Sequence, residues 1–336
     1  MKAMVVKRPK ERLILEERER PTLGPGQALI KVHACGVCHS DLHALLGDFP
    51  FAKFPLVLGH EVAGVVEAFG EGVNWPKVGT RVGMPWLYSA CGHCPACLKG
   101  DEVLCPEMQV TGVTVDGGYA EYMQAPAAYL TPIPDELTFE EAAPLMCAGL
   151  TVYNALVNAG FKPGQKVAVI GLGGLGHMAV AYAKAMGGRV AVVSSSSAKE
   201  AQAKMLGAER FIDTGRVGVE GGLKAWDGGA DIVLATAPNA KLATEAIKGL
   251  GADGVVVAIG VMSEPIEASA MELVSGRKKL IGSPSGSRKD LRNALEIAAK
   301  LGVRAQVSTY GLTQANEVLE KMQKGELQGR AVLVPR

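Results

Sequence analysis

One stretch limits the possible folds of this chain more than any other: residues 166–187 read K-V-A-V-I-G-L-G-G-L-G-H-M-A-V-A-Y-A-K-A-M-G. The apolar run before the glycines has the pattern of a buried parallel strand. Gly171, Gly173 and Gly176 follow as G-x-G-x-x-G, where the predicted strand turns into a predicted helix. Glycines at this spacing allow a tight turn, close approach of a pyrophosphate and close helix–strand packing, and the helix N-terminus then faces the phosphates. With a second predicted strand at 189–193, the stretch predicts a dinucleotide-binding unit.

The end of that second strand bears on the choice of cofactor. NAD-binding domains usually place Asp or Glu there, where the carboxylate accepts a hydrogen bond from the ribose 2′-hydroxyl. This chain has no acidic residue at that point, and instead carries Ser194, Ser195, Ser196 and Ser197, with Lys199 close behind. Serine hydroxyls and a lysine would hold a 2′-phosphate, which a carboxylate would repel. We therefore expect NADP; the alternative is that the serines only cap the next helix and that NAD is also used.

Further strands extend the same domain. Apolar runs at 231–236, 254–260 and 278–282 predict strands four, five and six of one sheet. The expected fold class is therefore α/β, with a six-stranded, doubly wound parallel sheet of the Rossmann type.

Length and composition restrict what the rest of the chain can be. At 336 residues the chain predicts two domains, and 48% hydrophobic with 21% charged residues indicates a globular protein. A net charge of +1 gives no electrostatic reason to expect binding to nucleic acid or to a membrane surface. The first residues, M-K-A-M-V-V-K-R, predict a strand and not a signal peptide, and no apolar run is long enough to span a bilayer. We expect a cytoplasmic protein, in which seven cysteines favour metal binding over disulfides.

The N-terminal part predicts a different architecture. Up to residue 143, short β-branched runs alternate with Gly and Pro, which is typical of a mainly-β domain. A helix is expected near residues 40–46, with Ser40 or Asp41 capping its first turn. The expected strands include 28–34, 62–68, 80–84 and 119–124.

Helical patterns return later in the chain. Residues 140–157 predict a helix with a break around Pro144. After Pro284 the chain predicts two helices, at 291–300 and 313–324, with a short strand between them and a last strand at 330–334. We expect these last segments to return to the first domain, which is then discontinuous in sequence.

A cysteine-rich loop lies inside the predicted β domain and reads C-G-H-C-P-A-C-L-K-G-D-E-V-L-C. Its four thiols, Cys91, Cys94, Cys97 and Cys105, have the tight spacing of a complete tetrahedral zinc site. The loop has little apolar sequence, so metal binding would supply its folding energy. The alternatives are four free cysteines or a redox pair at Cys94 and Cys97, but no thioredoxin-like unit surrounds them. We expect a structural zinc site.

A second group of possible ligands begins with C-G-V-C-H-S-D-L-H at residues 35–43 and continues in G-H-E. Cys38 and His60 can supply two ligands to a zinc ion, and a catalytic zinc usually takes three protein ligands and keeps one position open. Cys147 is the candidate for the third. Asp41, His43 and Glu61 can supply hydrogen bonds around the metal and carry protons. A metal beside a dinucleotide-binding domain suggests hydride transfer to or from an oxygen-bearing carbon.

These motifs together resemble the zinc-dependent medium-chain alcohol dehydrogenases over the whole chain. C-G-V-C-H-S-D-L-H-A, G-H-E-x-x-G, the four-cysteine loop, C-A-G-L-T, G-L-G-G-L-G and G-R-A-V-L occur in the family's order. The resemblance implies a GroES-like catalytic domain at 1–150 and 285–336, with a structural zinc lobe at 88–107, and a Rossmann domain at 151–284. It implies an active site in the cleft between them, two zinc ions per subunit and the short microbial homotetramer, with a homodimer as the alternative.

The resemblance also implies roles for individual residues. Cys38, His60 and Cys147 resemble the catalytic zinc ligands, and Glu61 the carboxylate that approaches the metal during ligand exchange. Asp41 resembles the residue that orients His60. Ser40 and His43 resemble the two ends of a proton relay that runs through the cofactor ribose, while Phe49 and Trp86 resemble substrate-pocket residues. His39 and Arg330 resemble pyrophosphate contacts, and Thr151 and Leu175 nicotinamide contacts. The full expected cofactor set is His39, Thr151, Gly171, Gly173, Gly174, Leu175, Gly176, Ser194, Ser195, Ser196, Lys199, Ile259 and Arg330.

The implied activity is alcohol oxidation or, in reverse, aldehyde reduction. Zinc would polarise the substrate oxygen so that an alkoxide forms near neutral pH. The aromatic pocket favours small primary alcohols and aldehydes, or benzyl- and cinnamyl-type ones, and the serine run matches the NADP-using cinnamyl-alcohol-dehydrogenase-like branch. One alternative is a polyol or other secondary-alcohol dehydrogenase, although polyol enzymes tend to have a carboxylate where this chain has Cys147. Others are a zinc-free reductase, an inactive scaffold and a zinc-ribbon nucleic-acid-binding protein, which would need a basic face.

Overall fold

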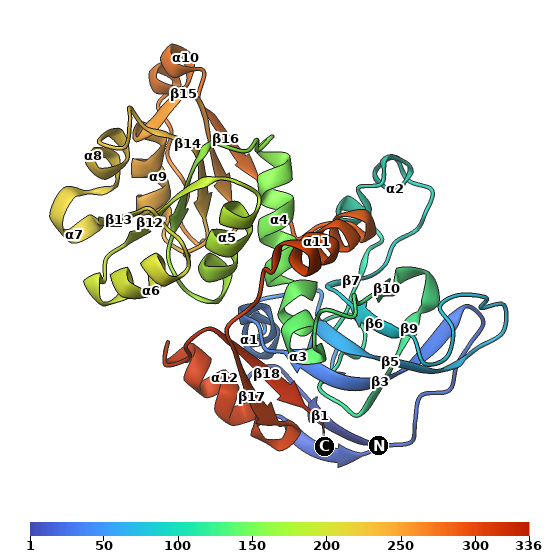
Figure 1. Cartoon of the computed structure of the whole chain (residues 1–336). Coiled ribbons are helices and arrows are strands. Elements are labelled where there is room, and N and C mark those ends of the chain that lie inside the picture. Colours follow the sequence, from blue (N-terminus) through green and yellow to red (C-terminus); the bar gives the residue numbers. More distant parts are fainter. Residues whose placement is uncertain (336) are drawn as a thin grey trace. The chain divides into compact units, whose positions relative to one another are not determined.

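The computed structural model describes residues 1–335, which form two units (Figure 1). The first unit contains Met1–Leu150, Gly286–Ala299 and the described residues from Ala305 on. The second contains Thr151–Ser285 and a short return segment, Lys300–Arg304. The sequence analysis had placed that return segment with the catalytic domain, within 285–336.

The second unit is built on one parallel sheet with the strand order β13-β12-β11-β14-β15-β16. Every adjacent pair in it is parallel, so the predicted six-stranded Rossmann arrangement is confirmed. The fifth strand starts earlier than expected, at Leu250, and ends at Ala258. The third strand, β13, was not placed from the sequence. The six strands are β11 (Lys166–Ile170), β12 (Arg189–Ser194), β13 (Arg210–Asp213), β14 (Ala230–Ala235), β15 (Leu250–Ala258) and β16 (Lys279–Gly282).

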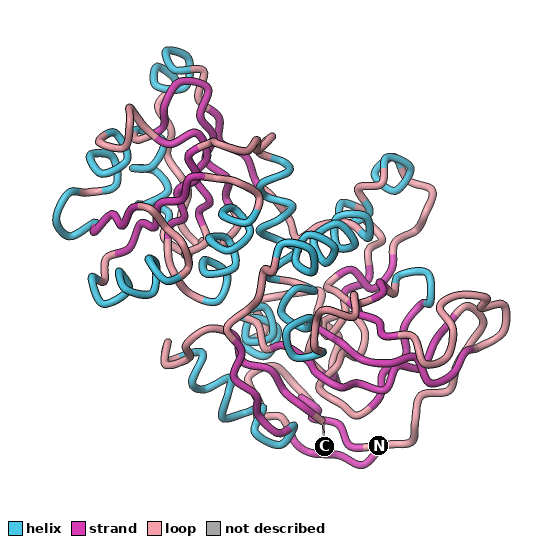
Figure 2. The backbone as a smooth tube through the Cα atoms, viewed as in Figure 1, coloured by secondary structure: helices cyan, strands magenta, loops and turns pink. Residues whose placement is uncertain are grey.

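Helices flank this sheet (Figure 2). The central strands are almost wholly apolar, as strands covered on both faces must be. The core beneath the helices includes the buried Trp226. The helices of this part of the chain are α4 (Ala148–Asn158), α5 (Gly174–Ala185), η4 (Ser197–Lys199), α6 (Glu200–Met205), α7 (Thr214–Val217), α8 (Val219–Lys224), α9 (Ala240–Lys248) and α10 (Ala270–Gly276).

The first unit is mainly β, as predicted. Its largest sheet has the order β10-β6-β5-β3-β18-β17, and β9 also pairs with β3. A second sheet has the order β2-β1-β4, and β7 and β8 form a ribbon. The strands are β1 (Lys2–Val6), β2 (Ile14–Glu17), β3 (Gln27–Gly36), β4 (Leu56–Val57), β5 (Glu61–Phe69), β6 (Arg81–Met84), β7 (Leu87–Ser89), β8 (Gln109–Val110), β9 (Tyr122–Pro126), β10 (Thr131–Pro132), β17 (Val307–Gly311) and β18 (Arg330–Val334).

One strand prediction was wrong by three residues. The strand expected at 119–124 begins only at Tyr122 and runs to Pro126. The reason lies in the backbone of Tyr119, which donates to the Leu58 carbonyl at 2.9 Å and accepts from the Met4 amide at 2.8 Å. These bonds tie Tyr119 to the loop before β5 and to β1, and not to the β3 ladder.

Short helices connect the strands of the first unit: α1 (His39–Leu46), α2 (Pro95–Lys99), η1 (Glu102–Leu104), η2 (Ala127–Tyr129), α3 (Phe139–Ala142), η3 (Ala143–Met146), η5 (Leu312–Gln314) and α12 (Ala315–Gln323), with α11 (Arg288–Leu301) the longest. The expected break around Pro144 is confirmed, because α3, η3 and α4 follow one another there. Cys147 is the residue between η3 and α4, and its backbone is not helical (φ −128°, ψ −69°). No helix among the described residues is long and apolar enough to cross a membrane.

Candidate active site

The first unit brings together four side chains that can bind a metal. The ligand atoms of Cys38, His60, Glu61 and Cys147 all lie within 4.8 Å of one another. Cys38 precedes α1, His60 directly precedes β5, Glu61 is the first residue of β5, and Cys147 occupies the break before α4. The two thiol sulfurs are 4.0 Å apart although 109 residues separate them in the sequence. The fold therefore gathers all three ligands expected from the sequence, with the expected carboxylate beside them.

The hydrogen bonds of His60 fit a metal ligand. Its side chain is fully buried, and its Nδ1 lies 3.0 Å from Asp41 Oδ1. Its Nε2 is buried and has no hydrogen-bond partner among the described residues. An unpaired buried nitrogen is costly, and an imidazole whose Nδ1–H is held by a carboxylate offers its Nε2 lone pair to a metal. Burial lowers the pKa of His60, but Asp41 and the Cys38 sulfur outweigh it and raise the pKa well above its usual value.

The two thiols differ in acidity. A hydrogen bond from Cys147 holds the pKa of Cys38 well below its usual value, despite burial. The same contact, together with burial, raises the pKa of the Cys147 thiol. The contact therefore favours one thiolate and one thiol in the pair, and the thiolate is the form that binds a metal. Binding a divalent ion here would release the second proton.

Glu61 and Arg330 form a buried pair next to these thiols. Glu61 is fully buried, Arg330 is 5% exposed, and Arg330 Nη2 donates to Glu61 Oε1. Burial raises the pKa of Glu61 to about 8, and the charge of Arg330 opposes that rise. The other carboxylate oxygen of Glu61 has no partner among the described residues. The sequence analysis assigned Arg330 to the pyrophosphate, whereas the structure pairs its guanidinium with Glu61.

Asp41 holds His60 through a network that includes a residue the sequence analysis missed. Asp41 is fully buried and accepts from the Cys38 amide at 2.8 Å and the Gly59 amide at 3.1 Å. The hydroxyl of Tyr119 donates to Asp41 Oδ2 at 3.0 Å. Tyr119 is also fully buried, and burial raises the pKa of its phenol well above the usual value, so it stays a donor. Tyr119 follows a D-G-G turn 78 residues after Asp41, and no sequence spacing links the two.

The expected relay residues lie along α1. Ser40 Oγ is 4.0 Å from Cys38 Sγ. His43 lies three residues further on, is partly exposed, and has its Nδ1 2.8 Å from Asp48 Oδ2. His39, the first residue of the helix, is exposed. Of the two residues expected to cap α1, Asp41 does so, because its carboxylate accepts a hydrogen bond from the Cys38 amide.

The expected pocket residues form an aromatic wall beside His60. The Trp86 ring meets the His60 ring edge-on with centroids 5.0 Å apart, and Phe49 meets Trp86 at 5.8 Å. Phe51, which the sequence analysis did not assign, stacks on Phe49 at 5.4 Å and is 49% exposed. Three aromatic rings therefore lie in series, starting at the candidate metal site.

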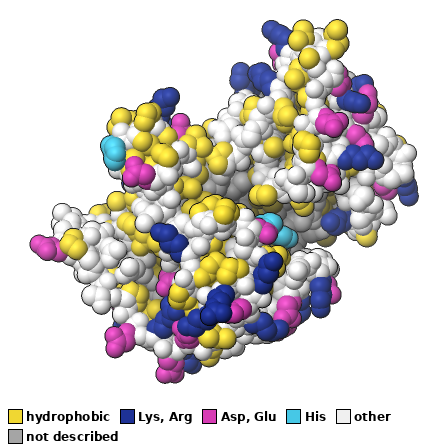
Figure 3. Space-filling view, turned by 180° about the vertical axis from the view of Figure 1, so that it is seen from behind, with side chains coloured by type: hydrophobic (Ala, Val, Ile, Leu, Met, Phe, Trp, Pro, Cys, Tyr) yellow, Lys and Arg dark blue, Asp and Glu magenta, His cyan; other side chains and the backbone are white. Residues whose placement is uncertain are grey.

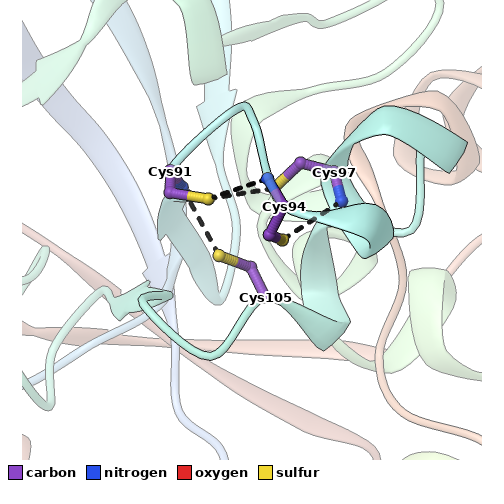
Figure 4. Close-up of side chains that lie close together, drawn as sticks. All are labelled: Cys91, Cys94, Cys97 and Cys105. Atoms are coloured by element: carbon purple, nitrogen blue, oxygen red, sulfur yellow. Dashed lines mark hydrogen bonds between the residues drawn. The ribbon is translucent and has the colours of Figure 1, made fainter.

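The four-cysteine lobe has the geometry of a closed metal site (Figure 4). The sulfurs of Cys91, Cys94, Cys97 and Cys105 lie within 4.8 Å of one another. Backbone amides point at them: Cys91 N donates to Cys105 Sγ at 3.4 Å, Cys94 N to Cys91 Sγ at 3.3 Å and Cys97 N to Cys94 Sγ at 3.5 Å. Such bonds stabilise thiolates, which four-coordinate zinc requires. The structure therefore brings together the four cysteines expected from the sequence.

The three glycines of the G-x-G-x-x-G turn in the second unit differ in their surroundings. Gly171 has φ +90°, and a Cβ there would lie 2.8 Å from Ala237 Cβ. A Cβ on Gly176 would lie 2.1 Å from the Gly171 carbonyl oxygen. A Cβ on Gly173 would meet nothing within 4 Å, so that position faces open space at the N-terminus of α5. Gly174 and Leu175 form the first turn of this helix.

The remaining cofactor candidates lie at the same edge of the sheet or in α4. Ser194 ends β12, and its Oγ accepts from the Ser196 amide at 3.3 Å. Ser195 and Ser196 are exposed, and Ser196 makes no side-chain capping bond to the helical turn that ends at Lys199. No side-chain hydrogen bond from Ser196 therefore supports the alternative that the serines cap the next helix. Ile259 follows β15, and Thr151 lies in α4 and is 8% exposed.

Fold and site together define a class of protein. A doubly wound parallel sheet with a glycine turn, a mainly-β unit with a Cys2His cluster and a separate four-cysteine lobe are the parts of a zinc-binding dehydrogenase. Two family models match the chain: the alcohol dehydrogenase GroES-like domain at residues 24–135 and the zinc-binding dehydrogenase at residues 174–324.

Individual relatives agree with these matches. An alcohol dehydrogenase of Geobacillus stearothermophilus is 46% identical over 99% of both chains. The solved cinnamyl alcohol dehydrogenase of Sorghum bicolor superposes with a TM-score of 0.91 at 32% identity, covering 99% of this chain and 97% of that one. CAD from Helicobacter pylori, complexed with NADP(H), superposes with a TM-score of 0.89 at 25% sequence identity, covering 99% of this chain and 97% of that one. Acetophenone reductase from Geotrichum candidum, in complex with NAD, superposes with a TM-score of 0.86 at 31% identity, covering 99% of this chain and 96% of that one. The chain therefore belongs to the zinc-dependent alcohol dehydrogenases, a family of oxidoreductases.

Proposed function

We propose that this alcohol dehydrogenase holds two zinc ions per chain, a catalytic one at Cys38, His60 and Cys147 and a structural one in the four-cysteine lobe. The observation that carries the proposal is the buried, unpartnered Nε2 of His60, whose ring lies in a cluster with two thiols and a carboxylate. Zinc held there would act as a Lewis acid on the substrate oxygen. Glu61 lies close enough to the cluster to take part in ligand exchange.

The side chains of α1 would move the proton of the alcohol. Ser40 is near enough to Cys38 for its hydroxyl to accept a proton from a substrate bound beside the sulfur. His43 lies one helical turn further along the same face of α1 and reaches solvent, so it can release that proton. The contact with Asp48 favours the tautomer in which His43 Nδ1 carries the hydrogen. This arrangement supports a relay from Ser40 through the cofactor ribose hydroxyl to His43.

The aromatic wall supports a preference for apolar substrates. Trp86 and Phe49 present ring surfaces next to His60, and neither carries a charge. We propose small primary alcohols, or benzyl- and cinnamyl-type alcohols, and the matching aldehydes as substrates. Polyols would leave hydroxyl groups without partners against these rings, which costs binding energy.

The serine run supports NADP as the preferred cofactor. The segment from Ser194 to Lys199 contains no carboxylate, its hydroxyls at Ser195 and Ser196 are exposed, and one structural relative was solved with NADP(H), although another was solved with NAD. The test is to compare kcat/KM for NADPH and NADH with cinnamaldehyde. We expect a preference for NADPH of at least roughly tenfold, which Ser195→Asp reverses by repelling the 2′-phosphate. Equal use of the two cofactors by the wild-type enzyme would contradict the assignment.

Self-association is also part of the proposal. The strand β16 ends the order of the Rossmann sheet and so has an unpaired edge among the described strands. Beside it in sequence, Val261, Met271 and Val274 are 68%, 75% and 75% exposed. We propose a homotetramer, with a homodimer as the alternative. Light scattering coupled to size-exclusion chromatography measures the mass directly, and a monomer would contradict both.

The zinc assignment is tested by counting metal. Elemental analysis should find two zinc ions per chain in the wild-type protein. Cys147→Ala should lose one zinc ion and turnover while the lobe zinc stays, because it removes a ligand of the catalytic site and leaves all four lobe cysteines in place. Cys35→Ala is the matched control, since Cys35 is buried in the same unit but lies outside both clusters. Retained turnover in Cys147→Ala would show that the third ligand is misassigned.

A further inference from the structure

The hydroxyl of Tyr119 completes the hydrogen bonding of Asp41. Each Asp41 oxygen receives two hydrogen bonds: Oδ1 from the Gly59 amide and His60 Nδ1, and Oδ2 from the Cys38 amide and the Tyr119 hydroxyl. We propose that Tyr119 is a positioning residue of the candidate catalytic zinc site, which acts through Asp41 on His60 and thereby sets how tightly the metal is held. This inference rests on the proposed role of His60 as a zinc ligand.

Four hydrogen-bond donors fill the acceptor capacity of the buried Asp41 carboxylate. An ionised carboxylate offers about four lone-pair directions and no proton. Asp41 is fully buried, and four donors occupy those directions. Because the carboxylate cannot donate, the hydrogen between it and the imidazole belongs to His60 Nδ1. His60 Nε2 is then the ring nitrogen left to bind a metal, which would displace any proton that it carries.

Packing fixes the Tyr119 hydroxyl in space. The backbone of Tyr119 is held on both sides, by the Leu58 carbonyl and the Met4 amide. Its ring lies against Gly59, where a Cβ would come within 2.4 Å of Cδ1. The hydroxyl therefore cannot leave Asp41 without moving the loop that carries His60. Tyr119 is the only one of the four donors whose hydrogen bond a side-chain substitution removes without touching a candidate ligand or the main chain.

Tyr119→Phe tests this inference, because it removes the hydroxyl and keeps the ring. Tyr88→Phe is the matched control: Tyr88 is buried in the same unit, and its hydroxyl donates to the Gln124 carbonyl at 3.4 Å, away from Asp41. Zinc release from the purified, zinc-loaded proteins into a colorimetric chelator is followed in time. The Cys147→Ala protein, which lacks the catalytic zinc, identifies the phase that belongs to the lobe.

We expect Tyr119→Phe to lose the catalytic zinc at least roughly tenfold faster than wild type, because losing a hydrogen-bond partner around a metal ligand typically costs about 10- to 100-fold in metal affinity. The lobe zinc should leave at an unchanged rate, and Tyr88→Phe should match wild type in both phases. With Co2+ as the probe, the visible absorption bands of the catalytic site should shift in Tyr119→Phe only. 4-Aminophenylalanine at position 119, which restores an N–H donor, should restore slow release.

The outcomes separate this inference from the function on which it rests. If the wild-type protein holds metal at both sites and Tyr119→Phe matches Tyr88→Phe in release rate and cobalt spectrum, Tyr119 only fills space and the inference is overturned. If the wild-type protein holds metal in the lobe alone, the proposed zinc site and the inference fail together. Faster release from both sites would also overturn the inference, because it would indicate general loosening of the unit.

Discussion

At the level of single residues, Gly59 decides whether the candidate zinc site can form. It directly precedes His60, has φ +99° and donates its amide to Asp41. Few side chains tolerate that backbone conformation, and a Cβ would also approach Cys35 Sγ to 2.7 Å. The sequence G-H-E therefore contains a glycine that the structure requires on two independent grounds.

Gly59→Ala should destabilise the protein more than the same change at Gly72. Gly72 has φ +78°, but a Cβ there would meet nothing within 4 Å, so it reports the backbone cost alone, about 1–2 kcal/mol. Gly59→Ala adds the clash with the Tyr119 ring, about a further 1–3 kcal/mol. Urea unfolding measures both free energies, and zinc analysis should show loss of metal only in Gly59→Ala. Equal free energies for the two variants would mean that the Tyr119 ring moves aside without cost.

At the level of secondary-structure elements, the turn from β11 into α5 contains one glycine needed for packing and another that faces the expected cofactor site. Gly176 allows the helix to lie against the Gly171 carbonyl, while Gly173 faces open space. Gly176 is thus required by contacts inside the protein, whereas Gly173 has no such contact and is open to a ligand. One substitution at each position can distinguish the two requirements.

We expect Gly176→Ala to lower the free energy of unfolding by about 1–3 kcal/mol, because its Cβ has no room. Gly173→Ala should change it by less than about 1 kcal/mol, but should weaken NADPH binding by roughly 10- to 100-fold, because the methyl group would occupy the place of the pyrophosphate. Urea unfolding and fluorescence titration with NADPH measure the two quantities. A Gly173→Ala protein with unchanged NADPH affinity would remove this turn from the cofactor site.

An ion pair links the candidate zinc lobe to α11. Glu102 in η1 is 7% exposed and pairs with Arg288 of α11, whose Nη1 also donates to the Ala128 carbonyl at 2.8 Å. Removing the Arg288 guanidinium would leave the nearly buried Glu102 carboxylate without this hydrogen-bond partner, which costs free energy. Arg288→Met should therefore loosen the lobe and speed zinc release from it, while release from the catalytic site stays unchanged. Arg12→Met, at an exposed pair with Glu320, is the control that should have no effect.

At the level of the whole molecule, the two units carry different candidate ligand sites. Both candidate zinc sites lie in the first unit, and the glycine turn and serine run lie in the second. A ligand that binds only the folded form stabilises the unit that binds it. The net charge of +1 and the mixed basic and acidic side chains on the face shown in Figure 3 offer no basic surface for nucleic acid, which counts against the zinc-ribbon alternative.

Hydrogen exchange should reveal this division. NADPH at 100 times its Kd should stabilise the second unit by about 2.7 kcal/mol and slow exchange in β11 and β12. Chelation of zinc should instead speed exchange around residues 91–105, because a metal held by the four cysteines would supply much of the folding energy there. Mass spectrometry of peptic fragments resolves both effects. Equal protection of both units by NADPH would show that they unfold together.

Much of this architecture was predictable because the decisive signals are local. G-x-G-x-x-G with a strand on each side predicts a Rossmann unit, since the glycines and strands are neighbours in sequence. Four cysteines within fifteen residues predict the lobe for the same reason. The strand at 119–124 was misplaced because the backbone partners of Tyr119, at Met4 and Leu58, are far away in the chain.

By itself, the sequence determined the two unit types, the four-cysteine lobe and the set of residues able to bind zinc. Short spacings fix which side chains share a turn, a strand or a helix face, whatever the rest of the chain does. Tertiary packing alone decided which distant groups meet: Cys147 with Cys38, Tyr119 with Asp41, and Arg330 with Glu61. These contacts depend on how whole elements pack, because burial forces each polar group to find a partner that no local spacing can specify.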